Sequence, residues 1–519
     1  RQYRWTNGFY LGLRDGALYP RWLAGANNGL GSPIFIYYPP LTFYVAAGFR
    51  AITGNQILAL TLATWLGMAM SGLTMYLFSR SWFSRTESVF AASLYMLIPA
   101  HVFEVYQLSA LAEFWCFAWL PLLFETIRRT VSDSSWRSTA FLGISYALLI
   151  FTHLPLTLIT SMVLPVYALV LTRDLRKLVR VAAGLGLGAG LGTVFLVPAM
   201  LERKYIRSEV VLDIFDYRNF FAFEHLRSAF KHSPFSTDQS QAGYVLENEP
   251  IAIGLALLLV LVSLTILDKR RAGALVGHGR LLTAVWVTTV ISLLMTTRLT
   301  MWVWSSIPLL AFVPFPGRWQ VISAAGVCFL AAAAFHAIVH DPRRRILHVT
   351  ALAAAIIFNL WLTGLSIKRA PHDPEGIDPG PYFKEERFYN PIWLDRSAIE
   401  GFQDDSPLTV ITGDASVQES GSRSFEQLYT ARAHTWSLLR LRTAYFPGWT
   451  AYVDGARAQV DSSEQGNILL GIQPGEHRLT IRFEDTPPRT AGKCISVVSL
   501  LIVAGMLYAN RRRVMSDEC

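Results

Sequence analysis

The sequence has little charge and little cysteine for its length. Only 16% of its 519 residues are charged, whereas 52% are hydrophobic. This balance excludes a soluble globular protein as well as a disordered chain. Of its four cysteines, Cys116, Cys328 and Cys494 fall in apolar stretches and Cys519 ends the chain. None of them pairs with another in a polar loop or has metal-ligand spacing, so neither a disulfide framework nor a cysteine-based metal site is predicted.

Basic residues outnumber acidic ones, 46 to 37, but their distribution argues against a nucleic-acid partner. They gather in short connectors between apolar stretches, which is the pattern of cytoplasmic loops in membrane proteins. These residues are Arg80 and Arg85; Arg128, Arg129 and Arg137; Arg173, Arg176, Lys177 and Arg180; Lys269, Arg270, Arg271 and Arg280; Arg343, Arg344 and Arg345; and Arg511, Arg512 and Arg513. The sequence therefore predicts a polytopic membrane protein with these connectors inside and no nucleic-acid partner.

Stretches of roughly 20 apolar residues, the length that a helix needs to cross a bilayer, recur along the chain. They predict a membrane all-α polytopic bundle of about eleven spans, with a small extracytoplasmic all-β domain after it. The expected spans are residues 56–79, 87–104, 108–127, 138–153, 156–172, 181–200, 250–267, 280–297, 319–339, 346–366 and 491–509. Residues 33–52 are also apolar, but Pro39 and Pro40 interrupt them. We therefore expect an interfacial element there, within a first outer loop at 1–55.

The composition changes after the bundle, whose expected range of 56–366 includes a large outer loop at 201–249. Prolines and charged residues at 367–394 predict a stiff linker. Residues 395–486 predict a β-domain, because Leu479, Ile481 and Phe483 alternate with polar residues and glycine-containing turns separate such runs. The final span at 491–509 and a cytoplasmic tail at 510–519 complete the expected organisation.

Gly184, Gly188 and Gly192 recur at four-residue intervals inside one apolar stretch. A phosphate-binding glycine loop needs a strand before it and a helix after it, and no strand precedes this run in the sequence pattern. Small residues at this spacing let two helices approach closely. The pattern therefore predicts helix packing.

The first outer loop carries polar and aromatic residues that could bind an anionic, sugar-bearing substrate at the membrane surface. They are Arg14, Asp15, Tyr19, Arg21, Trp22 and Asn27. The alternative is an ordinary interfacial loop with aromatic anchors. The residues by themselves do not separate these two interpretations.

Glu113 is the sharpest candidate for chemistry. It lies about five residues, or roughly 8 Å, inside the outer end of the expected span 108–127, where a carboxylate is costly unless it is paired or faces water. His153 lies in a tight outer turn and could be a general base or a helix-end partner. Glu202 and Arg318 lie at the same expected membrane level, so these side chains could share a cleft.

A series of motifs, in this order along the chain, resembles a known family. The motifs are residues 18–22 (LYPRW), 27–33 (NNGLGSP), 37–41 (YYPPL), 109–113 (SALAE), 120–122 (LPL), 152–155 (THLP), 198–199 (PA) with Glu202, 315–318 (FPGR), 445–449 (YFPGW), 452–455 (YVDG) and 474–477 (PGEH). Together they resemble the GT-C superfamily of membrane glycosyltransferases. More narrowly, they are similar to bacterial membrane proteins described as 6-pyruvoyl-tetrahydropterin synthase-related. The resemblance covers nearly the whole chain and departs at Leu108, where relatives often carry an arginine.

The resemblance implies sugar transfer from a polyprenyl-phosphate donor to a cell-envelope glycan acceptor at the outer face of the bacterial cytoplasmic (inner) membrane. A carboxylate would take the acceptor's proton, and cations or a divalent metal ion would stabilise the leaving phosphate. Asp15, Glu113 and His153 are then the catalytic candidates. The substrate-binding candidates are Arg14, Tyr19, Arg21, Trp22, Asn27, Glu202 and Arg318. In that superfamily the main acid lies early in the first outer loop, so we expect it upstream of Arg1, in a segment that this chain lacks.

Two other classes stay open. A transporter of lipid-linked glycans would place ionisable groups near the bilayer centre, often on broken helices, whereas the centres of the expected spans carry almost no charge. A non-catalytic envelope scaffold would use the β-domain to hold partners. The residues that precede Arg1 would distinguish the scaffold from an enzyme.

Overall fold

The computed structural model of the chain describes residues 2–133, 135–208, 216–222, 242–270, 275, 279–368, 389–395, 399 and 406–517. The chain divides into two compact units. The helical unit comprises Ala63–Leu191, Leu212–His372 and Val498–Cys519, and the sandwich unit comprises Arg1–Leu62, Gly192–Val211 and Asp373–Val497. Most of the expected linker at 367–394, and much of the expected outer loop at 201–249, lies outside the described residues.

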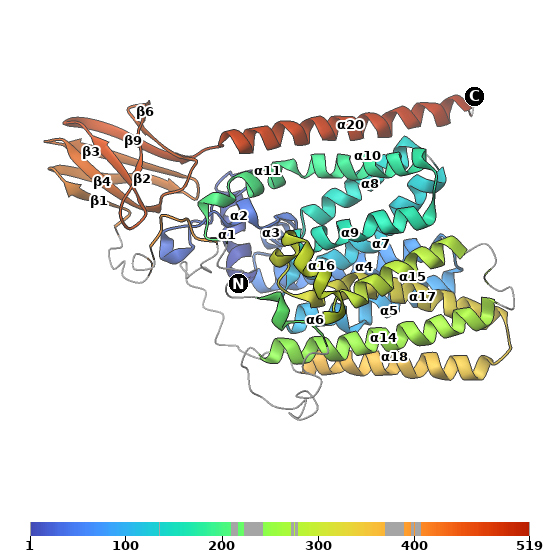
Figure 1. Ribbon diagram of the computed structural model, residues 1–519. Helices are drawn as coiled ribbons and strands as arrows, with labels where there is room; N and C mark the ends of the chain where they lie inside the picture. Colours follow the sequence, from blue (N-terminus) through green and yellow to red (C-terminus); the bar gives the residue numbers. More distant parts are fainter. Residues whose placement is uncertain are drawn as a thin grey trace. The chain divides into compact units, whose positions relative to one another are not determined.

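The helical unit consists of helices that run side by side (Figure 1). Its α-helices are α4 (Gln56–Arg80, from Ala63 onward), α5 (Arg85–Leu97), α6 (Pro99–Tyr106), α7 (Leu111–Asp133), α8 (Trp136–Ile150), α9 (Leu154–Leu171), α10 (Leu175–Leu191), α14 (Ala242–Arg270), α15 (Gly279–Leu294), α16 (Met301–Ser306), α17 (Gln320–His340), α18 (Arg345–Lys368) and the end of α20 (Pro487–Asp517). Short 3-10 turns join some of them, namely η3 (Tyr217–Asn219), η4 (Arg298–Thr300), η5 (Pro308–Phe312) and η6 (Pro316–Trp319).

Fewer helices than expected have the length and composition of a membrane span. Among the described residues seven do, or eight if α10 and the bent helix that follows it count as one span. The seven are Gln56–Arg80, Arg85–Tyr106, Leu154–Leu171, Glu249–Lys269, Pro316–His340, Arg345–Lys368 and Pro487–Ala509. The prediction of about eleven spans is therefore not supported.

The physical reasons differ among the helices that fall short. Helix α7 carries Glu113, Glu125, Arg128 and Arg129, so it has more charged residues than the membrane-capable helices have in their apolar stretches. Helices α8 and α15 have only 15 and 16 residues, fewer than the roughly 20 that a bilayer needs. The expected span at 181–200 ends its first helix at Leu191 and continues as a separate helix. An apolar stretch in the sequence is thus not always one straight helix.

Helix α17 is the core of the helical unit. It is composed mainly of alanine and other small residues, and 89% of its most apolar window is buried. It packs against α14, α15, α5, α6 and α7, and small side chains let neighbouring helices approach it closely. The two ends of α17 are therefore held in place by several neighbouring helices.

The predicted glycine packing is present between α10 and α8. A Cβ atom on Gly188 would lie 2.6 Å from the carbonyl oxygen of Gly143, and one on Gly184 would lie 2.8 Å from Leu142. In contrast, a Cβ atom on Gly186 would meet nothing within 4 Å. The two contacting glycines are thus the ones that a close helix crossing requires.

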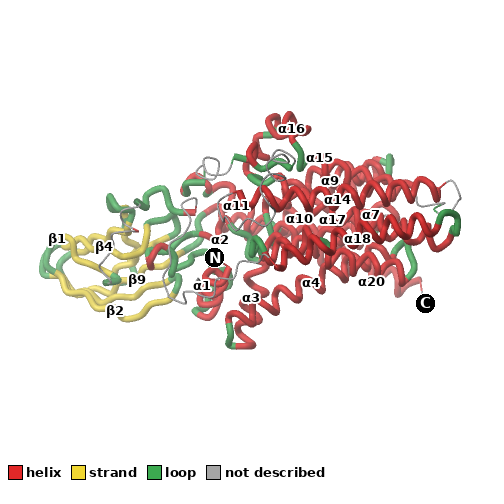
Figure 2. The backbone as a smooth tube through the Cα atoms, turned by 90° about the horizontal axis from the view of Figure 1, so that it is seen from below, coloured by secondary structure: helices red, strands yellow, loops and turns green. Residues whose placement is uncertain are grey.

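The sandwich unit contains two antiparallel sheets, which are drawn in yellow in Figure 2. One has the order β1-β4-β8-β7 and the other the order β2-β3-β9-β5-β6. The strands are β1 (Leu408–Thr412), β2 (Ala415–Arg423), β3 (Glu426–Ala433), β4 (Ser437–Ala444), β5 (Trp449–Val453), β6 (Ala456–Ala458), β7 (Asp461–Ser462), β8 (Asn467–Ile472) and β9 (Gly475–Phe483). The alternation predicted for β9 is confirmed, because Leu479 and Ile481 are buried between the sheets.

The sandwich unit also contains helices and 3-10 turns from other parts of the chain. They are α1 (Gln2–Arg14), η1 (Asn27–Gly29), α2 (Ile34–Tyr37) and α3 (Leu41–Thr53), together with α11 (Thr193–Leu201), η2 (Arg203–Tyr205) and the start of α20. Trp22 contributes its indole to the same buried cluster as Trp449 and Phe446. Gly31, at φ +83°, is needed beneath it, because a Cβ atom there would lie 2.4 Å from the indole nitrogen. The β-domain therefore shares one core with Trp22, Leu30 and Ile36, whereas α1 and α3 pack around Trp5, Phe9 and Phe43 in a separate cluster.

Candidate functional site

Three of the predicted side chains meet in the helical unit, in what we call the Glu113 cluster, which consists of Glu104, Glu113, His153 and Arg318. Glu113 lies in the first turn of α7, and Arg318 lies in η6 just before α17. Nε of Arg318 donates to Oε1 of Glu113 at 2.9 Å, and Nε2 of His153 lies 3.3 Å from the same oxygen. A carboxylate in an apolar helix was expected to need a partner, and Glu113 has a guanidinium and an imidazole beside it.

His153 is fixed by two contacts that define its protonation. Its Nδ1 accepts a hydrogen bond from the backbone N–H of Leu156 at 3.3 Å and caps the N-terminus of α9. A ring nitrogen that accepts carries no hydrogen, so in the neutral imidazole the hydrogen is on Nε2, facing Glu113. His153 therefore presents its Nε2 side to the carboxylate across a 3.3 Å contact.

Glu104, on α6, is the member of the cluster that the sequence did not single out. It is buried and lies within hydrogen-bond reach of Glu113. A hydrogen bond between two carboxyl groups needs a proton on one of them. With one proton on the pair, the charge of Arg318 balances the remaining carboxylate, which is the arrangement that a low-dielectric interior favours. A single acid inside the apolar run from Pro99 to Tyr106 was the signal that could have identified it.

The cluster lies at one end of the helical unit. Glu113 and His153 are at the starts of α7 and α9, and Arg318 immediately precedes α17. Basic connectors follow the opposite ends of the same three helices. Because such connectors mark the cytoplasmic side of membrane proteins, this end is the one that we expect to face outward.

Glu202 forms a second buried ion pair, in the sandwich unit. Its Oε2 accepts from Nη2 of Arg489 at 2.8 Å, and its Oε1 accepts from the Thr486 hydroxyl. Arg489 is completely buried and also donates to the backbone oxygens of Glu484 and Pro447. Through the ion pair with Glu202 and these backbone hydrogen bonds, Arg489 connects the start of α20 to η2 and to the turn before β5.

Arg21 and Tyr19 of the first loop are held in the sandwich unit as well. Arg21 pairs with Asp485 at 3.0 Å, and its guanidinium carbon lies 4.4 Å from the centre of the Tyr19 ring. The Tyr19 hydroxyl donates to the backbone oxygen of Phe35 at 2.7 Å. Burial raises the pKa of the Tyr19 phenol well above its ordinary value of 10, so that it stays a neutral donor.

The remaining first-loop candidates have structural contacts of the same kind. Asp15 accepts from both the backbone N–H and the hydroxyl of Ser424 in the β2–β3 turn. Asn27 is completely buried and donates to Oδ1 of Asn390 at 2.9 Å. Trp22 belongs to the core described above, whereas Arg14 is exposed at the end of α1. Asp15, Asn27 and Trp22 thus join the first loop to distant parts of the chain.

A cavity of about 750 Å³ lies in the sandwich unit, between β5, β6 and the start of α20. Its lining includes Trp449, Arg457, Glu484, Asp485 and Cys494. The volume is that of a small-molecule site, and the lining combines an indole with charges of both signs.

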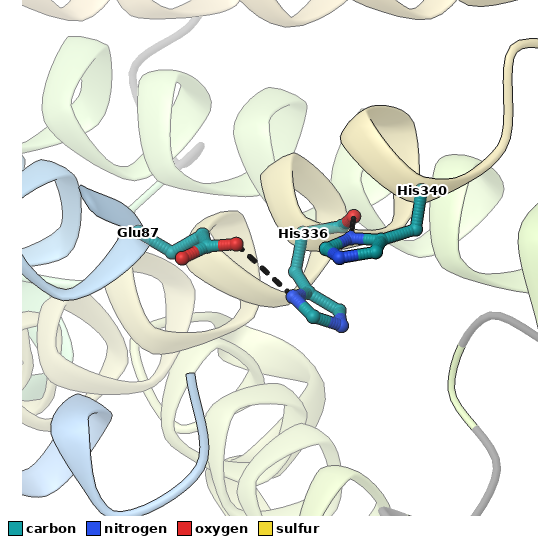
Figure 3. Close-up of side chains that lie close together, drawn as sticks. All are labelled: Glu87, His336 and His340. Atoms are coloured by element: carbon teal, nitrogen blue, oxygen red, sulfur yellow. Dashed lines mark hydrogen bonds and ion pairs between the residues drawn. The ribbon is translucent and has the colours of Figure 1, made fainter. Parts of the chain in front are cut away.

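Metal-ligating geometry occurs elsewhere in the helical unit. Among the described residues, the side chains of Glu87, His336 and His340 offer ligand atoms that all lie within 4.8 Å of one another (Figure 3). His336 and His340 end α17, whereas Arg318 precedes its start. The metal-capable group and the Glu113 cluster therefore lie at opposite ends of one buried helix.

The fold and the two polar clusters define a class, namely a polytopic membrane protein that carries a β-sandwich after its helical bundle. Residues 35–370, more than half of the chain, match the family described as "6-pyruvoyl-tetrahydropterin synthase related domain; membrane protein". The chain belongs to this family. The matched range includes Glu113, His153 and Arg318 and ends before the β-sandwich begins. A comparison with curated proteins gives no match.

Proposed function

We propose that this protein is a glycosyltransferase of the GT-C type. It would move a sugar from a polyprenyl-phosphate donor to a cell-envelope glycan at the outer face of the bacterial inner membrane. The observation that carries the proposal is the Glu113 cluster, in which a buried carboxylate, a guanidinium and an imidazole meet at the end of the bundle opposite the basic connectors. The ordered motifs that resemble GT-C enzymes support the same chemistry.

Each member of the cluster has a role in this reaction. The donor's phosphate binds Arg318, whose planar fork matches phosphate oxygens. Arg318 then releases hydrogen bonds that now go to Glu113, and the freed carboxylate accepts the proton of the acceptor hydroxyl. The bond between the sugar's anomeric carbon and the phosphate oxygen breaks, polyprenyl phosphate leaves with the bonding electrons, and the acceptor oxygen forms the new glycosidic bond.

His153 and Glu104 set the state of the base. Nε2 of His153 lies beside the Glu113 carboxylate, and the capping contact of Nδ1 fixes the position of the ring. Glu104 supplies a second buried carboxyl group beside Glu113, and one proton shared by the two would leave a single negative charge to balance Arg318. Asp15 is kept as a catalytic proposal, and the other first-loop residues are kept as proposed contacts of the substrate.

The proposed orientation follows the basic connectors. It places the β-sandwich and the Glu113 cluster outside and the C-terminal tail, with Arg511 to Arg513, inside the cell. Membrane lipid, a polyprenyl-phosphate-linked sugar and an envelope glycan are the partners that this arrangement requires. A divalent metal ion could assist the phosphate leaving group, but the proposed steps need only Arg318 as the cation.

The test compares two glutamates of one helix. Glu113 and Glu125 are both buried in α7, and Glu125 pairs with Arg128 and Arg129 at its other end. The protein is reconstituted in lipid nanodiscs with a panel of radiolabelled polyprenyl-phosphate monosaccharides and an envelope-glycan extract. Glu113→Gln is expected to lower sugar transfer by at least about 100-fold, the usual contribution of a general base. Glu125→Gln is expected to leave the rate within about twofold of wild type.

Three results would overturn the proposal. Glu113→Gln protein that is folded and transfers sugar at the wild-type rate would remove the carboxylate from the chemistry. Wild-type protein that transfers sugar from no donor, while pulling down envelope glycan through the β-sandwich, would favour the non-catalytic scaffold. Movement of a labelled lipid-linked glycan between leaflets without transfer would favour the transporter.

A further inference from the structure

Three potential metal ligands come together where α5 begins and α17 ends (Figure 3). Glu87 lies in the first turn of α5, and His336 and His340 are four residues apart in the last turns of α17. Residues at this spacing lie on one face of a helix, and the two rings are 4.1 Å apart between centroids. Because α5 packs against α17, the carboxylate and the imidazoles approach each other across a helix interface.

The carboxylate of Glu87 is incompletely satisfied. The residue is 3% exposed, and its Oε1 faces Nδ1 of His336 at 3.0 Å. Its buried Oε2 has no hydrogen-bond partner among the described residues. A buried carboxylate oxygen without a partner is costly, and a cation bound beside it would remove that cost.

His340 is already oriented as a ligand. Its Nδ1 lies 2.8 Å from the backbone oxygen of His336, to which it donates. Metal-binding histidines commonly donate one ring N–H to a carbonyl or carboxylate, because this contact fixes the tautomer and directs the other nitrogen to the metal. The contact therefore assigns Nε2 of His340 as its ligand atom.

We propose that Glu87, His336 and His340 form a binding site for a divalent transition-metal ion, with Zn²⁺ as the representative ion. Two imidazoles and one carboxylate form a ligand set that suits Zn²⁺ and its neighbours, whereas Mg²⁺ and Ca²⁺ take oxygen ligands. Zinc sites place ligand atoms about 2.0–2.2 Å from the ion. The present cluster reaches that geometry when its ligands, which lie within 4.8 Å of one another, close around the ion.

The site differs from a closed structural zinc site because one coordination position stays open. Three protein ligands leave a fourth tetrahedral position for water or a small anion, and exposed His340 keeps that position accessible. The ion would also join the start of α5 to the end of α17, next to the connectors that carry Arg85 and Arg343. It would thus sit at the opposite end of α17 from the Glu113 cluster and act independently of the proposed sugar transfer.

A second histidine of the helical unit provides a matched control. His348 also faces a carboxylate, because its Nε2 lies 2.9 Å from Oδ2 of Asp268. Its Nδ1, however, lies 3.1 Å from the hydroxyl of Thr265, so both ring nitrogens are occupied. His348 is not part of the metal-capable group of the described residues. His348→Ala should therefore leave metal binding unchanged.

The experiment measures metal content and affinity of the full-length protein in detergent. The protein is purified through a tag without histidine, stripped with a chelator and titrated with Zn²⁺, and bound metal is counted by inductively coupled plasma mass spectrometry. Wild type and His348→Ala are expected to bind one Zn²⁺ per chain. Glu87→Gln and His340→Ala are expected to bind Zn²⁺ at least about tenfold more weakly. Loss of a residue that only supports a metal ligand already lowers metal affinity by about 10- to 100-fold.

A cobalt titration checks the ligands directly. Co²⁺ bound to the wild type should show visible d–d absorption that His340→Ala lacks, and an unchanged elution volume in size-exclusion chromatography shows that the variant is folded. Exposed His340 is the preferred position because its replacement leaves the helix interface intact. The proposal is overturned if stripped wild type takes up no Zn²⁺, or if folded His340→Ala binds Zn²⁺ and Co²⁺ as tightly as wild type.

Discussion

Replacing Arg318 by alanine would leave the Glu113 carboxylate buried without its cation. Removing one partner of a buried ion pair typically costs about 3–5 kcal/mol. The carboxylate can limit this cost by taking a proton. At pH 7 that costs about 3.7 kcal/mol, since each pH unit above the ordinary glutamate pKa of about 4.3 costs about 1.36 kcal/mol. The His153 imidazole and the Glu104 carboxyl group remain beside the Glu113 carboxylate, so about 3.7 kcal/mol is a ceiling.

The same reasoning gives a pH dependence with a definite sign. In Arg318→Ala the folded state holds a proton on Glu113 that the unfolded chain lacks at pH 7. The loss of stability is therefore largest at neutral pH and is relieved as the pH falls toward about 4.3. At pH 5 the ceiling is about 1 kcal/mol. The double variant Glu113→Gln/Arg318→Ala lacks the Glu113 carboxylate and should lose the part of this pH dependence that Glu113 adds.

The assay is denaturant-induced unfolding in detergent at pH 5 and pH 7, followed by tryptophan fluorescence. Arg129→Ala is the matched control, because Arg129 is half-exposed on the same helix and its partner Glu125 keeps Arg128. That change should cost no more than about 1 kcal/mol at either pH. The reasoning fails if Arg318→Ala loses as much stability at pH 5 as at pH 7, or if the double variant shows the same pH slope.

Two further predictions concern packing and the β-sandwich. Gly188→Ala should destabilise the protein by about 1–3 kcal/mol, because its methyl group would press on the backbone of Gly143. Gly186→Ala should be neutral or stabilising by up to about 1 kcal/mol. If the two variants had equal effects on thermal unfolding, the close crossing of α10 and α8 would be contradicted. In the sandwich, the hydrogen bond with Asp454 raises the pKa of His477, and the same contact lowers the pKa of Asp454. Their pair should stabilise most between about pH 4 and 6.5 and weaken as the pH rises through the raised pKa of His477. His477→Gln should flatten this profile in pH-dependent unfolding, and an unchanged profile would refute the assignment.

The sequence predicted those features that follow from one element's own residues, namely a charged group in an apolar stretch or a regular spacing of residues. The expense of a carboxylate inside an apolar stretch predicted a partner for Glu113, and Arg318 and His153 lie on it. Four-residue spacing predicted the close approach at Gly184 and Gly188, and two-residue alternation predicted the buried face of β9. In each case one element's own pattern carried the information.

Features that depend on a distant segment escaped the sequence. Trp22 and Asn27 had the composition of a ligand-binding loop, yet their contacts are Trp449 and Asn390. An indole or a carboxamide has the same pattern whether it faces a sugar or a strand that arrives much later in the chain. Glu87 is likewise separated from the histidines of α17 by most of the bundle's sequence, so only the packing of α5 against α17 brings them together.

The sandwich unit is assembled from three separate stretches of the chain, and this sets a timetable for its synthesis. Arg21 and its partner Asp485 are 464 residues apart. At about 5–20 residues per second, a ribosome needs roughly 20–90 s to make that interval. During this time Trp22 has no core to enter, and its apolar surface is open to proteases and chaperones. A chain stopped anywhere before the last strands would therefore leave Trp22 without the core into which it packs.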